Sequence, residues 1–178
     1  KNDTNGEKIS ILLDPGLVFG TGTHPSTRDC LDALELATGL KRFNTVLDLG
    51  TGTGLLALAA AKLGSRCVVA ADLNFLAAKT AERNVRLNHL QNRVVTIQGR
   101  AEDIIAYPAD LVIANIHYNV MRQLVTDRSF LAKKRFILSG LLRSEARDIT
   151  SILARHPLKI IKQWTEGIWY TIYGRIKL

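Results

Sequence analysis

The chain has 178 residues, of which 47% are hydrophobic and 22% charged, and its formal net charge is +8. That length suits one domain with a substantial core, and that composition excludes a disordered tail. The longest apolar run, residues 55–61, is too short to span a bilayer, and residues 1–8 are too polar to open a signal peptide. We therefore expect one cytoplasmic domain, residues 1–178, without membrane contact.

The charge and the two cysteines constrain the function only weakly. A net charge of +8 is compatible with an acidic or nucleic-acid partner, including RNA, and equally with a solvated basic face. Cys30 and Cys67 match neither a disulfide framework nor a zinc-ligand spacing. We expect both thiols to be small buried groups in a reducing cytosol, and we expect no metal site.

In chain order, a short apolar stretch (residues 10–13) and a glycine-rich loop (residues 14–25) precede the first predicted helix. Pro25 suits a first helical turn, Ser26 suits a cap, and Gly39 ends the helix. Short apolar runs then alternate with helical patterns. Strands are predicted at residues 45–49, 67–71, 94–97, 111–114 and 136–138, and helices at residues 55–63, 75–87, 118–131 and 144–155.

The order of these elements predicts the fold class. Strands that alternate with helices form a parallel sheet covered on both faces. The end of the chain departs from this pattern, because two β-rich runs, residues 158–165 and 168–176, are separated by Glu166-Gly167 and are typical of a hairpin. We therefore predict an α/β, Rossmann-like, seven-stranded mixed sheet: parallel strands followed by a C-terminal antiparallel hairpin.

Residues 46–54 read Val-Leu-Asp-Leu-Gly-Thr-Gly-Thr-Gly where a strand turns into a helix. Glycines let the backbone approach a ligand closely, and the following helix offers free N–H groups. The candidate cofactor contacts in this turn are Asp48, Gly50, Gly52 and Gly54. Residues 52–57 also fit the alanine variant of the dinucleotide fingerprint, so the turn alone does not separate cofactors.

Polar residues also follow three later strands. Asp72 ends the second predicted strand, 22 residues after Gly50, where a carboxylate can accept hydrogen bonds from ribose hydroxyls. Glu102, after the third strand, could face the exocyclic amine of adenine or simply favour a helix start. Asn115 ends the fourth strand beside the first, where the ligand of an open α/β sheet lies, and could orient an incoming amine.

The loop at residues 14–27 combines glycines, hydroxyls and His24 just before a helix N-terminus. This composition suits a lid, assigned to residues 1–25, over an anionic or zwitterionic ligand. The loop lacks the lysine of a phosphate-binding P-loop, which argues against nucleoside-triphosphate hydrolysis. His24 could act as a general base, but a turn or helix cap is the more common role of such a residue.

This loop, the glycine turn and residues 111–116 (Leu-Val-Ile-Ala-Asn-Ile) together resemble the PrmA-type ribosomal-protein methyltransferases. The resemblance covers nearly the whole chain and implies S-adenosylmethionine as the cofactor. It implies cofactor contacts at Thr27, Gly50, Asp72 and Asn115, with the loop closing over the methionine end through Phe19, Gly20, Thr21, Gly22 and Thr23. Members of that family carry an N-terminal substrate-recognition domain, which we expect to be absent from this chain.

The resemblance implies N-methylation of lysine or α-amino groups on a protein of the large ribosomal subunit. Asn115 is not followed by Pro-Pro-Tyr, which argues against base amines and glutamine amides as substrates. Asn115 would orient the amine, and no dedicated base is identified. The alternatives are an RNA or small-molecule methyltransferase, a nicotinamide-dependent oxidoreductase, and a non-catalytic binding module on ribosomal components.

Overall fold

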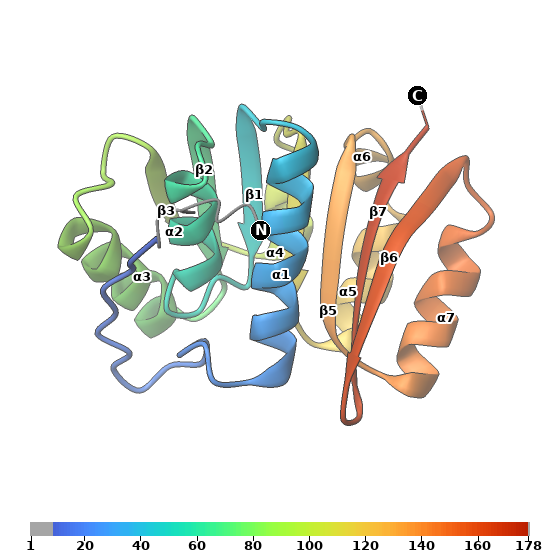
Figure 1. Cartoon of the computed structure of the whole chain (residues 1–178), viewed down its shortest axis with the longest axis horizontal. Coiled ribbons are helices and arrows are strands. Elements are labelled where there is room, and N and C mark those ends of the chain that lie inside the picture. Colours follow the sequence, from blue (N-terminus) through green and yellow to red (C-terminus); the bar gives the residue numbers. More distant parts are fainter. Residues whose placement is uncertain (1–8, 178) are drawn as a thin grey trace, which may run out of the picture.

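The computed structural model describes residues 9–177, which form one sheet between two layers of helices (Figure 1). The strands are β1 (Thr45–Leu49), β2 (Cys67–Asp72), β3 (Val94–Gln98), β4 (Leu111–Asn115), β5 (Arg135–Leu142), β6 (Leu158–Glu166) and β7 (Trp169–Ile176). The helices are α1 (Pro25–Leu40), α2 (Leu55–Lys62), α3 (Phe75–Leu87), α4 (Ala101–Ile104), α5 (Tyr118–Thr126), α6 (Arg128–Leu131) and α7 (Arg143–Leu153).

The sheet has the order β3-β2-β1-β4-β5-β7-β6. Strands β1 to β5 pair in parallel, whereas β7 is antiparallel to both β5 and β6. The predicted seven-stranded mixed sheet with a C-terminal hairpin is therefore confirmed. The strand order reverses between β1 and β4, and ligands of open α/β sheets bind beyond the carboxyl ends of the strands at such a reversal.

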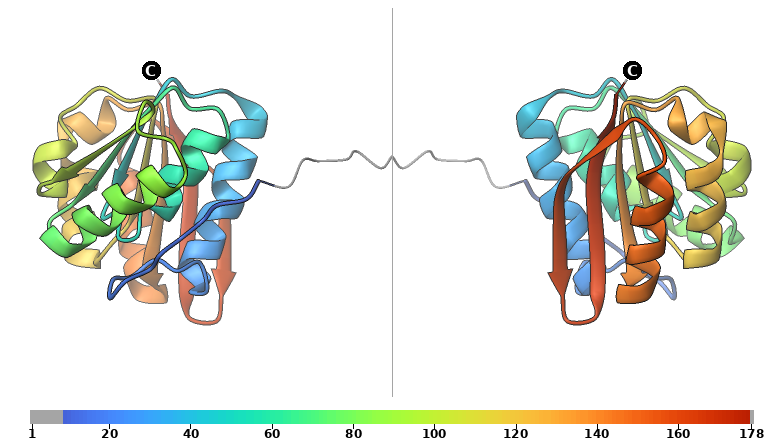
Figure 2. Two further views of the ribbon diagram at one scale, coloured as in Figure 1. Left: turned by 90° about the vertical axis from the view of Figure 1, so that its left-hand side faces the viewer. Right: turned by 90° about the vertical axis from the view of Figure 1, so that its right-hand side faces the viewer.

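Two apolar cores lie on opposite faces of the sheet. Along β1, Val46 packs with α1 and α2 on one face, and Leu47 packs with α5 and α7 on the other. Successive side chains of a strand point to opposite faces, so a strand covered on both sides is apolar at nearly every position. The end-on views show α1, α2 and α3 over one face and α4, α5, α6 and α7 over the other (Figure 2).

Three sequence-based expectations need correction. Residues 118–131 form two helices, because the Asp127 carboxylate accepts the Ser129 N–H (2.6 Å) and starts α6 as a new helix. Strand β5 is longer than predicted and contains a register shift between Leu138 and Leu141. Cys30 is buried, as expected, but the prediction for Cys67 was wrong. Its side chain is exposed because Cys67 is the first residue of β2, at the end of the sheet where the chain enters from solvent.

The parallel strands all end at one edge of the sheet, the lower edge in Figure 1. The turn of the β6–β7 hairpin and the loop before α1 reach the same edge. We call residues 9–24 the N-terminal loop; residues 1–8 of the predicted lid lie outside the described part of the chain. No helix within residues 9–177 is both long and apolar enough to cross a bilayer.

Candidate functional site

A cavity of about 310 Å³ opens at the carboxyl edge of the sheet, at the reversal between β1 and β4. Its walls come from the N-terminal loop, the turn at residues 48–54 (the glycine turn), the start of α3, and the end of β4. A volume near 300 Å³ is at the lower end of the range for small-molecule sites. The lining residues are Leu17, Val18, Phe19, Gly20, Thr27, Gly50, Thr51, Gly52, Leu55, Leu56, Asp72, Asn74, Leu76, Ala77 and Asn115.

The glycine turn has a backbone that other residues could not adopt without strain. Gly50 has φ +74°, and a Cβ there would lie 2.2 Å from Ile116 Cγ2. Gly52 has φ +55°, and its Cβ would lie 2.4 Å from the carbonyl oxygen of Phe19. Positive φ and close backbone approach are the two conditions that require glycine. The glycines thus serve both the turn and the contact between the turn and the N-terminal loop.

Asp48, on β1 at the start of the glycine turn, is buried and does not line the cavity. Its Oδ2 accepts hydrogen bonds from the Thr51 hydroxyl (2.6 Å) and from the Ala57 N–H (3.1 Å). Burial raises the pKa of this carboxyl to about 6, and the two hydrogen bonds offset part of that increase. Asp48 therefore fixes the turn to the start of α2 from below, a role that differs from the predicted cofactor contact.

Asp72 lines the cavity, and its carboxylate is held by the backbone. Oδ2 accepts the Gly52 N–H (3.0 Å), and Oδ1 accepts the Asn74 N–H (2.9 Å). A carboxylate oxygen can accept a second hydrogen bond, so each oxygen retains acceptor capacity toward the cavity. The structure thus presents an oriented acceptor pair at the position where the sequence predicts contacts to ribose hydroxyls.

Two asparagines, one in α3 and one at its C-cap, anchor the N-terminal loop. Asn84 is fully buried; its Nδ2 donates to the carbonyl oxygens of Asp14 (3.1 Å) and Thr53 (2.8 Å), and its Oδ1 accepts the Asp14 N–H (2.8 Å). One turn along, Asn88 Oδ1 accepts the Leu12 N–H (3.0 Å), and Asn88 Nδ2 donates to the Leu12 carbonyl (2.7 Å). Sequence reasoning missed both residues, because they lie 70 or more positions from the loop and form no motif with it.

The loop and the glycine turn are also joined directly. The Thr53 N–H donates to the Phe19 carbonyl (3.0 Å), and the Thr53 hydroxyl donates to the Gly20 carbonyl (2.6 Å). Thr53 is fully buried, so both bonds are protected from water. The loop therefore sits against the turn over Phe19 and Gly20, which line the cavity together with Leu17 and Val18.

His24 caps α1. Its Nδ1 accepts the Ser26 N–H (3.3 Å) and lies 2.8 Å from the Ser26 hydroxyl. The imidazole lies between Phe19 and Trp169, with ring centroids 5.3 Å and 4.9 Å away. Because Nδ1 is occupied by helix-capping contacts, the geometry supports the cap and not the general base.

The side chain of Asn115 reaches the start of α1. Its Nδ2 donates to the Ser26 hydroxyl (3.1 Å) and lies 3.5 Å from the Thr27 hydroxyl. A Cβ on Gly140 would lie 2.8 Å from Asn115 Oδ1, so β5 needs a glycine here for this amide to fit. Asn115 is thereby held at the cavity wall beside Thr27.

A second, mainly apolar cavity of about 430 Å³ shares Gly50 and Asp72 with the first. Glu102 lies on its wall, and its carboxylate is bonded to Arg100 (2.9 Å). That hydrogen bond is the main reason that the pKa of Glu102 is lowered, so the group is ionised at neutral pH. An acceptor on an apolar wall suits an amine of a planar ring, the role predicted for Glu102.

The predicted site residues fall into two groups. Seven line the first cavity: Phe19, Gly20, Thr27, Gly50, Gly52, Asp72 and Asn115. The others do not: Thr21, Gly22, Thr23, Asp48 and Gly54 shape the surrounding loops, and Glu102 lines the second cavity. Sequence reasoning missed the apolar wall, which consists of Leu17, Val18, Leu55, Leu56, Leu76 and Ala77.

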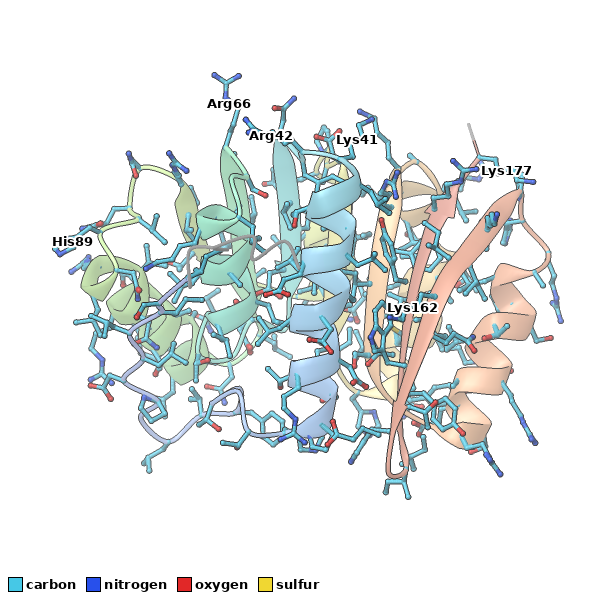
Figure 3. All side chains as sticks on the ribbon, viewed as in Figure 1. Lys41, Arg42, Arg66, His89, Lys162 and Lys177 are labelled. Atoms are coloured by element: carbon cyan, nitrogen blue, oxygen red, sulfur yellow. The ribbon has the colours of Figure 1, made fainter. Side chains whose placement is uncertain are left out.

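Several exposed basic side chains lie away from this site, whereas Arg28 and Arg83 contact the N-terminal loop and Arg100 lines the second cavity. Lys41, Arg42, Arg66 and Lys177 project from the opposite edge of the sheet, the upper edge in Figure 3. Lys162 lies on the outermost strand, β6. Within residues 9–177, no group of three or more His, Cys, Asp or Glu side chains is placed to hold a metal ion.

Comparison with known proteins identifies relatives of the whole chain. The sequence model of the family described as "Ribosomal protein L11 methyltransferase (PrmA)" matches residues 1–177. The ribosomal protein L11 methyltransferase of Desulfitobacterium hafniense is 39% identical over 171 residues, which cover 95% of this chain and 54% of that protein. The chain thus spans about half the length of the curated relatives it matches.

Solved structures agree with the sequence match. A ribosomal protein L11 methylase from Lactobacillus delbrueckii subsp. bulgaricus has a TM-score of 0.81 at 30% identity, covering 93% of this chain and 84% of that chain. An O-methyltransferase from Bacillus cereus, solved with SAH, has a TM-score of 0.70 at 17% identity, covering 86% and 83%. At that identity the second likeness shows the fold alone.

Proposed function

This chain belongs to the PrmA family of ribosomal protein L11 methyltransferases, and we propose that residues 1–178 are a domain that transfers a methyl group from S-adenosylmethionine to amino groups of a ribosomal protein. The observation that carries the proposal is the cavity at the carboxyl edge, where the oriented carboxylate of Asp72 and the amide of Asn115 face one space. The family match does not favour a nicotinamide-dependent oxidoreductase or a non-catalytic binding module.

The residues present fit the proposed cofactor. Gly50 and Asp72 line both cavities, and this arrangement suits a nucleoside with its ribose on Asp72 and its base on the apolar wall beside Glu102. The backbone at Gly50 and Gly52 leaves room that any Cβ would fill. Phe19, Gly20 and Thr27 remain for the amino-acid end, at the start of α1, where the positive end of the helix dipole favours a carboxylate.

The chemistry requires placement more than acid–base catalysis. When bound, the sulfonium supplies an activated methyl group. The protein must hold a neutral amine in line with it, and a lysine with a reference pKa of about 10.4 must lose its proton first. Asn115 is held by Ser26 and can orient such an amine through its amide. The contacts of His24 Nδ1 to Ser26 support a capping role for this residue and not that of a base.

We propose a lysine or α-amino group of a ribosomal protein as the acceptor, in a cytoplasmic enzyme. RNA remains a second candidate acceptor because the net charge is +8, although the labelled basic side chains in Figure 3 lie mostly away from the cavity. The two acceptors predict different labelled products, so one experiment separates them.

The experiment incubates the chain with methyl-labelled S-adenosylmethionine and, in parallel, with purified ribosomal protein L11 and with ribosomal RNA. We expect label in the protein, recovered as methylated amino groups after acid hydrolysis, and none with an Asn115→Ala variant that still binds S-adenosylhomocysteine. An exposed substitution, Asn92→Ala, is the matched control and should label normally. Label in RNA alone would contradict the protein acceptor.

A further inference from the structure

A buried hydrogen-bond chain lies behind Asn115, and of its members the proposed chemistry uses only Ser26. Its members are Ser26 and Asp29 on α1, Ser139 on β5 and Thr171 on β7. Asp29 is 6% exposed, Ser26 is 1% exposed, and the other two are fully buried. Buried polar groups normally have hydrogen-bond partners, so the donors and acceptors within this group of four residues should match.

The contacts run in one line. The Thr171 hydroxyl lies 3.4 Å from Asp29 Oδ2 and within hydrogen-bonding distance of the Ser139 hydroxyl. The Ser139 hydroxyl in turn lies 3.1 Å from the Ser26 carbonyl oxygen. Ser26 then faces Asn115 through its own hydroxyl (3.1 Å). The line therefore connects Asp29 to the cavity wall through residues of three elements.

Three contacts link Asp29, Thr171, Ser139 and the Ser26 carbonyl, and each needs one proton. The two hydroxyls supply one proton each, and a carbonyl supplies none. If Asp29 is ionised, only two protons are present for three contacts, so one contact has no donor. Either the Ser26 carbonyl receives no hydrogen bond, or lone pairs of two oxygen atoms face each other at one of the other two contacts. If Asp29 is a carboxylic acid, it donates to Thr171, Thr171 to Ser139, and Ser139 to Ser26, so all three contacts are satisfied.

The surroundings of Asp29 favour the acid. Burial is the main cause that raises the pKa of Asp29, and the nearby carboxylates of Glu166 and Asp32 raise it further. The Thr171 hydrogen bond and the charge of Arg28 act in the opposite direction. Next to Ser139, burial raises the pKa of the Cys30 thiol to about 12, so this thiol stays protonated.

We propose that Asp29 is a positioning residue, which as the carboxylic acid completes the hydrogen-bond chain that holds Ser26 and, through it, the amide of Asn115 at the cavity. The inference rests on the proposed function only in taking Asn115 as the residue beside the reacting amine. Loss of the Asp29 proton removes one hydrogen bond from the series between Asp29 and Ser26, and this weakens the contact between the start of α1 and β5. The amide orientation at Asn115 then depends on pH.

Nuclear magnetic resonance tests this without any methyl acceptor. The carboxyl carbon of Asp29 and the side-chain amide of Asn115 are followed from pH 4 to pH 8, with an Asn115→Asp variant to assign the amide. We expect Asp29 to titrate above the unperturbed value of about 3.9, and the Asn115 amide to shift with the same midpoint.

Three variants complete the design. Asp29→Asn keeps a neutral donor and should abolish the shared titration while leaving the transfer rate within about twofold of wild type. Thr171→Val removes the link and should lower kcat about tenfold, with S-adenosylhomocysteine affinity within about threefold. Glu35→Gln changes an exposed carboxylate on the same helix that is not among the charges acting on Asp29, and it should behave as wild type. Thermal unfolding of each variant monitors folding.

The inference is overturned if Asp29 titrates near 3.9, or if the Asn115 amide keeps its titration in Asp29→Asn. Unchanged kcat in Thr171→Val would also overturn it. Failure of the proposed function has a different signature. It appears as a wild-type protein that labels no ribosomal protein, whereas the shared titration is measured without any methyl acceptor and is present or absent independently of labelling.

Discussion

The two walls of the cavity are held in different ways. The glycine turn is part of the core: Asp48, Thr51 and Thr53 are buried, and its glycines touch neighbouring backbone or packed side chains. The N-terminal loop is largely exposed, with Leu17 94% and Phe19 67% exposed, and depends on polar contacts to α3 and to Thr53. Changes in the turn should therefore affect stability and ligand binding together, whereas changes in the loop should affect mainly binding.

The largest expected effect is that of Gly52→Ala. The new Cβ would meet the Phe19 carbonyl at 2.4 Å, in a left-handed backbone that alanine rarely adopts. Strain and the forced shift of the loop together should cost about 4 kcal/mol of unfolding free energy. S-adenosylhomocysteine affinity should fall about 100-fold, because the two walls separate. Urea unfolding and calorimetry measure the two effects.

Gly39→Ala is the matched control. Nothing lies within 4 Å of a Cβ at this position in α1. Alanine should stabilise the helix by about 0.5–1 kcal/mol and leave ligand affinity unchanged. Equal effects of the two substitutions would remove the distinction between the buried turn and the rest of the chain.

The second effect concerns the buried carboxyl beneath the turn. The pKa of Asp48 is raised from 3.8 to about 6, so the folded state holds its proton over a pH range in which the unfolded state has lost it. This contribution to stability is complete below pH 4, decreases as pH rises to about 6, and is constant above. It amounts to about 3 kcal/mol.

An Asp48→Asn variant lacks this titration. The difference in unfolding free energy, variant minus wild type, should therefore increase by about 3 kcal/mol between pH 4 and pH 6 and then level off. Urea unfolding at four pH values measures it. A difference that does not change with pH would show that Asp48 is not a buried proton acceptor beneath the turn.

The third effect tests the tie between the two walls. Asn84→Ala removes bonds to both Asp14 and Thr53 and leaves buried backbone groups unsatisfied, which should cost about 2 kcal/mol. The loop should loosen and S-adenosylhomocysteine affinity should fall about tenfold. Asn92→Ala, an exposed change, should do neither. Unchanged affinity in Asn84→Ala would mean that the loop holds its position without α3.

The smallest effect is at the outer surface of the loop. Arg28 forms an exposed ion pair with Glu166 in the hairpin and donates to the Thr23 carbonyl (2.9 Å). Exposed pairs contribute about 0–1 kcal/mol, so Glu166→Gln should shift the unfolding free energy by less than about 1 kcal/mol. Calorimetry should find affinity within about twofold of wild type. A larger loss would indicate that the hairpin tip, and not α3, fixes the loop.

Much of the fold was predictable because it depends on local patterns. Strand and helix periods, the glycine spacing and Glu166-Gly167 all act within a few residues, and the sheet topology follows from their order. The break of residues 118–131 was also readable in principle, since Asp127 is a good helix cap. The residue after a cap begins a new helix even where the apolar period continues.

Site residues were predictable only where a local motif requires a particular residue type, such as glycine in a tight turn or an acid at the end of a strand. Gly50, Gly52 and Asp72 line the cavity as expected. Asn84 and Asp29 could not be found, because their partners lie 70 and 142 positions away and are brought together only by the packed sheet. Asp48 was predicted as a ligand contact because an acid precedes the glycines, whereas the structure shows it buried and bonded to Thr51 and Ala57.

The most direct test of the central claim is calorimetric titration of the wild-type chain and an Asp72→Ala variant with S-adenosylhomocysteine and with NAD⁺. If the turn, the loop and Asp72 form one S-adenosylmethionine site, the wild type binds one S-adenosylhomocysteine per chain, and Asp72→Ala weakens it at least about tenfold, equivalent to roughly 1.4 kcal/mol. NAD⁺ should give no saturable heat. Preference for NAD⁺, or S-adenosylhomocysteine binding that is indifferent to Asp72, would contradict this assignment.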